Sequence, residues 1–417
     1  MKMLAQRVAW QWIAAVAVGG ASLGLQIALA RLIGPIEYGL FTMATSIATI
    51  AFVVQGGGYR LLVLRESVRR TEGFPSVPEL NAFARGYIAA ATAFLVALAL
   101  AGGRMLIASM SATAAIAIAA NAPRLIANLL SAELLARERL SEDARWQMFS
   151  RLIPFAAMIA AAAAGSGANG VLFALLAVQT AVLAWRPVGT AGFHIAFGGR
   201  RATWAAVHGI VLIDLFTQLY NRQSVFVLYA VHADLADIGR FGLMQRLLES
   251  YITLLSPLVT LFGNAVRLQG FRSAVFSRLS ANILTTAATL VGMAACAYVL
   301  AGPDLLEWLF GFNYRAAAPL APWLLGAAIF MAPNFMLGQA MIAKNQEWAF
   351  AAIVACVTAA NALLTWVLAS RHGSIGASQA MLATEILLFL LLAGWFWLRR
   401  ETVDTIATAE FPARSSE

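Results

Sequence analysis

The sequence predicts an all-α polytopic membrane protein with about 12 transmembrane helices in two six-helix lobes. The prediction rests on an apolar composition, on long apolar runs and on a repeat between the two halves of the chain. Of the 417 residues, 61% are hydrophobic and 12% are charged, and so few charges cannot cover a solvated surface. The runs can cross a hydrocarbon core of ~30 Å as helices. They do not alternate in polarity, as Ala156 to Ala164 illustrates, which argues against a membrane barrel.

Twelve spans are expected along the chain. They cover residues 9–32, 38–58, 86–102, 112–136, 147–165, 169–187, 204–230, 239–265, 279–301, 316–342, 347–369 and 374–398. The first apolar run follows Lys2 and Arg7 and extends from Val8 to Leu32. It is longer than the apolar core of a cleaved signal peptide, so we expect an uncleaved first helix.

The basic residues are distributed unevenly between the two sides of this topology. An even number of spans places both termini on one side. The loops and termini on that side hold 21 of the 29 Lys and Arg residues, the opposite loops hold five, and three lie inside spans. Basic loops face the cytoplasm, so both termini are predicted to be cytoplasmic. Topology and anionic lipid headgroups thus explain the net charge of +9, and no nucleic-acid partner is expected.

The two halves of the chain repeat each other. Tyr38-Gly39-Leu40 opens the second span, and Phe241-Gly242-Leu243 opens the eighth span 203 positions later. A shift of the same length superimposes the first span on the seventh and the sixth on the twelfth. Duplicated halves are common in transporters. We therefore predict an N-terminal lobe (1–195), a C-terminal lobe (196–400) and a cytoplasmic tail (401–417).

Ionisable residues inside the spans are the candidates for function, because such residues are costly in a membrane. Six are found: Arg124, Asp214, Arg222, Arg246, Glu249 and Glu385. In the seventh span Asp214, Gln218, Asn221 and Arg222 fall broadly on one helix face, which should line water or the other lobe. Arg246 and Glu249 are spaced i,i+3 and can form an ion pair. That pair is interpreted equally well as structural or as part of a ligand site.

Arg124, Arg222 and Arg246 would form an anion site if they converged, because the planar guanidinium group suits phosphate. The alternative for Arg124 is an interfacial side chain that snorkels from a helix end. Arg60 follows Gly56-Gly57-Gly58, which should break the second helix, and it would then lie at a cavity mouth. A flexible helix end is the alternative. Glu385, alone at mid-span, suits either a proton-coupling residue or a hydrogen-bonded packing residue.

Several classes of chemistry are not indicated. The chain has no Walker loop, no H-E-x-x-H, no G-x-S-x-G and no dinucleotide-binding glycine motif. Cys296 and Cys356 both lie in apolar runs, and the four histidines are scattered, so neither a disulfide nor a metal site is predicted. We expect no enzymatic activity, no catalytic residues and no cofactor.

Three segments carry a resemblance to a known family. RLIGPIEYGLF (31–41), followed by an apolar span and GGGYRLLVLRE (56–66), resembles the first two helices of bacterial polysaccharide flippases. YNRQSVFVLYAVHADLADIGRFGLMQRL (220–247) is similar to that family's seventh and eighth helices. FGFNYRAAAPLAPWLLGAAIFMAPNFMLGQAMIA (310–343) is similar to its tenth. The family is the O-antigen, or lipid-linked oligosaccharide, branch of the superfamily that also contains multidrug extruders and murein lipid flippases.

The resemblance implies a central, cation-lined cavity that opens alternately to each side of the bacterial cytoplasmic (inner) membrane. It implies a polyprenyl-diphosphate-linked glycan as substrate, for export of an O-antigen or exopolysaccharide. Membrane lipids, and a polysaccharide polymerase with its chain-length machinery, are the implied partners. One position departs from the family: Gln223 stands where many relatives carry an acidic residue. Ion coupling would then fall to Asp214 or Glu385.

The leading hypothesis is therefore a lipid-linked saccharide flippase. In it Arg124, Arg222 and Arg246 hold the diphosphate. Asp214, Gln218, Asn221 and Glu249 bind sugar hydroxyls or orient the arginines. A proton- or sodium-coupled multidrug extruder is the alternative, although it calls for an acidic cavity. A membrane glycosyltransferase would call for a large outer loop with carboxylates, and the outer loops here are short.

Overall fold

The computed structural model describes residues 2–69, 76–102, 108–186, 194–196, 201–231, 233–269 and 274–398. Every regular element in these ranges is helical. In chain order the elements are α1 (Lys2–Gly56), α2 (Tyr59–Arg69), α3 (Val77–Ala101), α4 (Ala108–Ala136), α5 (Leu140–Ala163), α6 (Gly167–Val182), η2 (Leu183–Trp185), α7 (Arg201–Ala230), α8 (Leu235–Gln269), α9 (Ala274–Phe310), η3 (Phe312–Leu320), α10 (Ala321–Ala343) and α11 (Glu347–Leu398).

Two of these elements each hold two membrane passes. Helix α1 is interrupted at Gly34, with φ 72° and ψ 172°, a conformation open almost only to glycine, and Pro35 then starts the second pass. Helix α11 is interrupted in the same way at Gly373. Eight stretches of the described chain are long and apolar enough to span a membrane, and they include the two double passes. With the more polar α7 and α8, the predicted twelve passes are confirmed.

The boundaries differ from the prediction in three places. Helix α3 begins at Val77, nine residues before the predicted start. A separate helix, α2, follows the predicted break, where Gly57 and Gly58 both have positive φ. Helix α9 is interrupted at Ala301 and continues to Phe310, and the 3-10 helix η3 precedes α10. These added segments mix polar and apolar residues, so a search for long apolar runs does not detect them.

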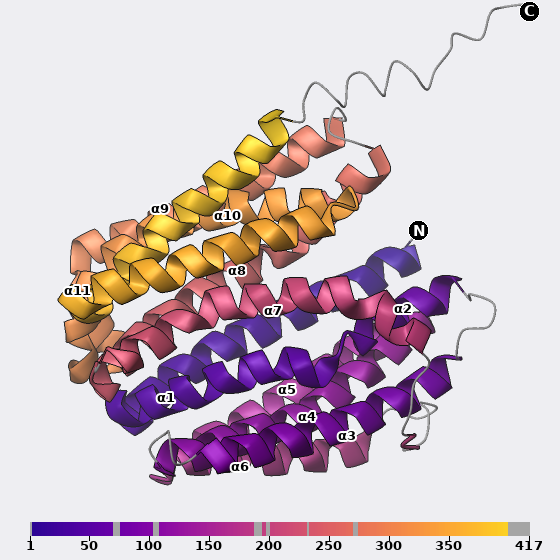
Figure 1. Cartoon of the computed structure of the whole chain (residues 1–417), viewed down its shortest axis with the longest axis horizontal. Helices are drawn as coiled ribbons and strands as arrows, with labels where there is room; N and C mark the ends of the chain where they lie inside the picture. The colour runs from indigo at the N-terminus through magenta and orange to yellow at the C-terminus, as the bar shows by residue number, and fades with distance from the viewer. Residues whose placement is uncertain are drawn as a thin grey trace, which may run out of the picture.

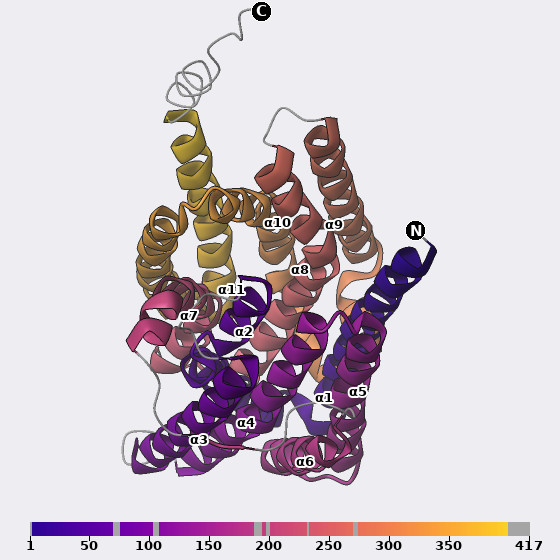
Figure 2. The same ribbon diagram turned by 90° about the vertical axis from the view of Figure 1, so that its right-hand side faces the viewer.

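The helices form two bundles, the lobes of the predicted fold class. Helices α3 to α6 pack together in one lobe and α8 to α11 in the other, with α1 and α7 between them (Figures 1 and 2). We call the end where α1 begins and α11 ends the terminus side, and the opposite end the far side. The predicted junction at residue 195 lies on a short segment between stretches outside the described residues, so that boundary stays a prediction.

The largest hydrophobic core shared by the two lobes lies on the far side. The largest buried cluster contains residues of both lobes, among them Leu29, Tyr38, Phe241 and Tyr314. Toward the terminus side one cluster around Leu62 and Leu129 lies in the first lobe, with Val211 of α7 packed against it, and another around Val259 and Met336 lies in the second lobe. The largest shared core therefore lies on the far side, and toward the terminus side the lobes meet where α7 packs on the first-lobe cluster.

Close approach of the backbones joins the lobes on the far side. A Cβ atom at Gly39 of α1 would overlap the carbonyl oxygen of Leu235, and one at Gly239 of α8 would overlap that of Pro35. A Cβ at Gly242 would overlap the side chain of Thr42. Two glycines of the repeated motif, Gly39 and Gly242, thus lie in one contact between α1 and α8.

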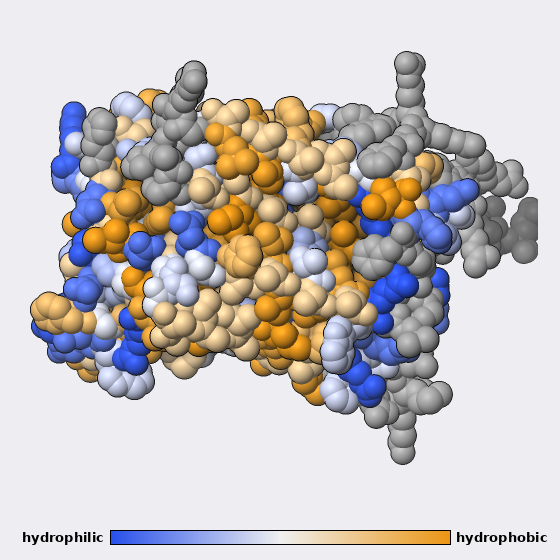
Figure 3. All heavy atoms as spheres, turned by 90° about the horizontal axis from the view of Figure 1, so that it is seen from below, coloured by the Kyte–Doolittle hydropathy of each residue, from blue (hydrophilic) through white to orange (hydrophobic). Residues whose placement is uncertain are grey.

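The molecular surface agrees with a membrane location. Seen from below the view of Figure 1, apolar residues form a broad belt across the middle, and hydrophilic residues gather toward both ends (Figure 3). Large side chains such as Phe94, Phe173 and Leu98 are exposed. Lipid contact accounts for their exposure, which would be unfavourable in water.

Candidate functional site

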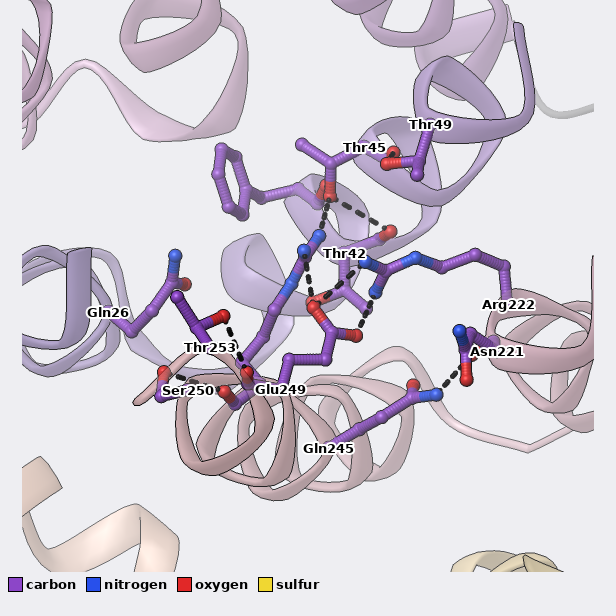
Figure 4. A network of polar contacts seen from close by, with 12 residues as sticks. Gln26, Thr42, Thr45, Thr49, Asn221, Arg222, Gln245, Glu249, Ser250 and Thr253 are labelled. Carbon is purple, nitrogen blue, oxygen red and sulfur yellow. Dashed lines mark hydrogen bonds and ion pairs between the residues drawn. The ribbon is translucent and has the colours of Figure 1, made fainter. Parts of the chain in front are cut away.

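The centre of the candidate site is an ion-pair network between α7 and α8. The guanidinium group of Arg222 contacts the carboxylate of Glu249 at 2.5 and 2.8 Å. Arg246, one turn before Glu249 on α8, contacts the same carboxylate at 3.1 Å. The pair predicted from the i,i+3 spacing is therefore present, and Arg222 joins it from the neighbouring helix. One carboxylate holds two arginines in place (Figure 4).

Arg246 also connects the two lobes. Its Nη2 atom donates a hydrogen bond of 2.9 Å to Oγ1 of Thr45 on α1. The glycine contact explains why this bond forms: Gly242, one turn before Arg246, packs against Thr42, and Thr45 follows Thr42 by three residues. Small residues at the crossing bring a polar side chain of one lobe within reach of a charged side chain of the other.

Arg124 of α4 faces this network from the first lobe. Its guanidinium group lies over the ring of Phe52 at 5.1 Å, a cation–π contact. It is close enough to Arg222 and Arg246 for their charges to interact, although both belong to the second lobe. Arg124 is exposed at the surface of the first lobe. Arg222 and Arg246 therefore share the carboxylate of Glu249, whereas the printed contact of Arg124 is with Phe52 in its own lobe.

Two further arginines extend this positive region. The charge of Arg151 on α5 acts on Arg124, and that of Arg60 at the start of α2 acts on Arg151. No carboxylate of the described chain pairs with Arg60, Arg124 or Arg151. Arg60 is among the residues that the sequence predicts for the site, and Arg151 is not, because Arg151 lies near the end of its span, where a basic residue fits a cytoplasmic loop equally well. Its position four residues inside that span was the available signal.

The remaining polar residues of α7 lie at different distances from the network. Asn221 is half-buried, and its carbonyl oxygen accepts a hydrogen bond from Nε2 of Gln245. Gln218 is half-buried one turn earlier, and Asp214 is exposed two turns before Arg222. Asp214 forms no ion pair with any described residue. The structure thus brings Asn221 beside the arginines and leaves Asp214 apart from them.

Glu385 lies in a separate network inside the second lobe. The residue is 3% exposed, and its carboxylate accepts hydrogen bonds from Tyr220 Oη at 2.9 Å and from Asn334 Nδ2 at 2.7 Å. Asn361 and Thr384 also bond to Tyr220. This geometry has the hydrogen bonds that a packing residue needs, and it includes no cation from the described chain. No group of three metal-ligating side chains occurs in the described ranges.

Comparison with known proteins identifies the fold. No family profile and no curated protein sequence matches the chain. Among solved structures, the lipid II flippase MurJ in an inward closed conformation matches with a TM-score of 0.70 and 12% identity, over 97% of this chain and 93% of that one. An outward-facing multidrug resistance MATE family transporter of the MOP superfamily matches with a TM-score of 0.66 and 13% identity, over 96% of each chain.

A third similar structure is a MOP superfamily transporter from Pyrococcus furiosus, described as having a binding pocket of reverse polarity. Its TM-score is 0.57 at 13% identity, over 93% of this chain and 92% of that one. At identities this low the likeness concerns the fold. The chain therefore has the all-helical, twelve-pass fold of MOP superfamily transporters, in agreement with the fold class predicted from sequence.

Proposed function

We propose that the chain is a flippase that moves a polyprenyl-diphosphate-linked saccharide across a membrane by alternating access, for export of a surface polysaccharide. The observation that carries the proposal is that Arg222 and Arg246 share the single carboxylate of Glu249, while Arg124 of the other lobe pairs with no carboxylate of the described chain. Three guanidinium charges against one carboxylate leave a positive site inside a membrane-spanning protein. An isolated excess of this kind is costly in a membrane, and a bound diphosphate would offset it.

Each residue of the site has a role in this proposal. Arg124 and Arg246 present N–H groups to the diphosphate, because guanidinium binds phosphate oxygens in pairs. Glu249 holds Arg222 and Arg246 in place while the site is empty. Gln218 and Asn221 on the neighbouring turns of α7 bind sugar hydroxyls, and Asp214 does so nearer the terminus side. The prenyl tail stays in the lipid.

The distribution of core contacts supports alternating access. The largest core shared by the lobes lies on the far side, and toward the terminus side the contact between them is the packing of α7 on the first-lobe cluster. Substrate would enter from the terminus side, where Arg60 and Arg151 lead toward Arg124. With the termini in the cytoplasm of a bacterium, as the basic loops predict, this is the inward-facing state of an inner-membrane protein. A polysaccharide polymerase with its chain-length machinery would act on the product.

A proton- or sodium-coupled multidrug extruder is the second candidate. It is favoured by the buried carboxylate of Glu385, which has no cationic partner in the described chain, and by the structural likeness to MATE transporters. Glu385 or Asp214 would be the coupling residue in either transport class. The arginine excess at the centre of the fold disfavours cationic drugs as the substrate.

Complementation tests the proposal. A bacterium that lacks its own polysaccharide flippase would receive the parent chain or Arg124→Ala, Arg222→Ala or Arg246→Ala at matched membrane abundance, and surface glycan would be scored. Arg315→Ala is the matched control, because Arg315 is exposed and pairs with Asp304 and Glu307 away from the site. We expect the parent and Arg315→Ala to restore glycan and the three site variants to fail.

Two other results would count against parts of the proposal. Glycan restored equally by all three arginine variants would retain a flippase but overturn this site. Failure of the well-expressed parent across hosts with different glycans, together with drug efflux that depends on Glu385, would favour the extruder.

A further inference from the structure

The contact between the lobes on the far side contains very few hydrogen bonds. Among the described residues two side-chain hydrogen bonds cross this contact: Arg246 to Thr45 Oγ1, and Arg31 to the carbonyl oxygen of Trp308. Arg31 is exposed at the edge of the contact, whereas Arg246 is largely buried and belongs to the ion-pair network. One bond between the lobes is thus made by a proposed substrate-binding residue.

Polar atoms without partners surround that bond. Four buried atoms here have no hydrogen-bond partner: Oγ1 of Thr42, Oγ of Ser46, Oε1 of Gln245 and Nε of Arg222. Thr42 and Gln245 lie on the two helices that meet here (Figure 4). Buried polar groups are nearly always bonded, and a permanent contact would be more stable with apolar side chains. Separation of the lobes on the far side would give these atoms water as a partner.

We propose that the Arg246–Thr45 hydrogen bond is a latch that keeps the far side closed, and that an anion bound by Arg222 and Arg246 releases it. The second half of this statement rests on the proposed function. Arg246 directs Nη1 to Glu249 and Nη2 to Thr45. A phosphate group binds guanidinium through two such N–H groups, and bonds between two charged groups are stronger than a bond to a neutral hydroxyl.

The latch links binding to the change of state. An anion that binds more tightly when Arg246 is free of Thr45 shifts the equilibrium toward the state in which the lobes part on the far side. The carboxylate of Glu249 is already held by Arg222, so the anion displaces the weaker contact, the one to Thr45. Empty transporter stays closed on the far side, and opening follows loading.

Cysteine accessibility tests the latch without any ligand. Ser46 is 0% exposed, so a cysteine at this position reacts with a maleimide only when the contact between α1 and α8 opens. The test uses Ser46→Cys in a chain in which Cys296 and Cys356 are replaced by Ala. In nanodiscs both faces of the protein are accessible, so the test does not depend on membrane orientation. Thr45→Val removes the acceptor and keeps the side-chain shape. A hydrogen bond to a charged group is worth about one order of magnitude in an equilibrium, so labelling should rise about tenfold.

Three controls separate the latch from general loosening. Thr49→Val removes a hydroxyl one turn away that bonds only to the backbone oxygen of Thr45, and it should leave labelling unchanged. Ser378→Cys, equally buried within the second lobe, should stay unreactive in the Thr45→Val background. Thr45→Ser should restore the parent rate. If Thr45→Val does not fold, Thr45→Ala gives the same comparison. Unchanged labelling at Ser46→Cys overturns the latch.

A second arm uses a polyprenyl diphosphate as the probe, with the matching polyprenol as control. The diphosphate should raise labelling of Ser46→Cys in the parent and add little in Thr45→Val, and the polyprenol should do nothing. Binding is measured separately by displacement of a fluorescent analogue. Absence of binding would contradict the proposed function, and the latch would then be tested only by the labelling experiment without ligand. Binding without a rise in labelling would overturn release by the anion.

Discussion

Arg222 on α7 and Glu249 on α8 are joined by contacts of 2.5 and 2.8 Å, although 27 residues separate them in the chain. The guanidinium group comes from a residue only 6% exposed. Glu249 also holds Arg246 at 3.1 Å, so its carboxylate serves two cations. Loss of Glu249 would therefore leave two arginines without their partner, whereas loss of Arg222 would leave Glu249 paired with Arg246.

Glu249→Ala should destabilise the protein more than Arg222→Ala. The first change leaves two guanidinium groups without a counter-charge, whereas the second leaves Glu249 paired with Arg246. Loss of one partner of a buried pair costs about 3–5 kcal/mol, and we expect the lower end because the side chain of Glu249 is 29% exposed. The apparent melting temperature in detergent, followed by tryptophan fluorescence, measures the difference. Equal or greater loss in Arg222→Ala would contradict the assignment of Glu249 as the shared partner.

Gly39→Ala and Gly239→Ala should disrupt the contact between α1 and α8. The added Cβ overlaps a backbone oxygen of the opposite helix in each case, and backbone cannot move aside as a side chain can. Overpacking costs about 1–3 kcal/mol where side chains adjust, so the loss here should be at least that large. It should appear as a lower melting temperature and as faster labelling of Ser46→Cys.

Gly24→Ala is the matched control for this effect. Gly24 lies in the same helix, and nothing stands within 4 Å of a Cβ built there. The change should be neutral, or stabilising by up to about 1 kcal/mol through helix propensity. A similar loss of stability in Gly24→Ala and Gly39→Ala would show that α1 tolerates no larger residue in general. It would contradict the claim that the close approach of α1 and α8 is what requires glycine at position 39.

The twelve passes could be predicted because the signal for a membrane helix is local. A run of apolar residues long enough to span the bilayer needs no knowledge of its neighbours. The break at Gly34 could also be predicted, since glycine and proline mark helix ends. Helix α2 and η3 were missed because each owes its place to packing: Leu62 and Val63 of α2 are buried against α4, and Tyr314 of η3 packs on Tyr38.

The candidate site could be predicted only as separate pieces. The Arg246–Glu249 pair follows from i,i+3 spacing on one helix. Arg222 and Arg124 were proposed because charge inside a span is costly, but their meeting depends on how the lobes pack. Thr45 carried no signal, since a single hydroxyl is common in membrane helices. Its importance comes from the glycines of α8, which bring it to Arg246.

Two substitutions of Glu385 distinguish a structural role of this residue from a role in ion coupling. Glu385→Ala removes the carboxylate that accepts from Tyr220 and Asn334 and leaves them the longer bond to Thr384 and the bond to the backbone oxygen of residue 385; we expect a loss of about 1 kcal/mol, the scale of one net hydrogen bond. Glu385→Gln keeps one amide oxygen as an acceptor and removes the titratable group, so it should fold nearly as well as the parent. Melting temperature measures both.

Transport then decides the coupling role of Glu385. If Glu385 couples transport to an ion gradient, Glu385→Gln should keep its fold and lose the dependence of glycan export on the proton or sodium gradient. Asn361→Ala serves as the control, because Asn361 bonds to the backbone oxygen of Tyr220 in the same network and carries no charge. Gradient-dependent export that persists in Glu385→Gln would leave this residue a structural role only.

Arg151 should contribute to anion binding although its helix lies away from the ion-pair network. Its charge acts on Arg124, and no carboxylate of the described chain offsets either side chain. Arg151→Ala should therefore weaken binding of a polyprenyl diphosphate about tenfold, the scale of one charge-assisted contact. Arg145→Ala is the matched control: it lies on the same helix, and its guanidinium group stacks over Trp10 at 5.8 Å.

The salt dependence of binding distinguishes a direct contact of Arg151 from a long-range effect. An arginine that contacts the diphosphate in a partly buried site is poorly screened, so the loss in Arg151→Ala should persist at high salt. A side chain that only raises the local potential should lose its effect as ionic strength rises. Equal affinity of Arg145→Ala, Arg151→Ala and the parent protein at every salt concentration would show that Arg151 does not contribute to binding. The proposed site would then consist of the arginines nearer Glu249 alone.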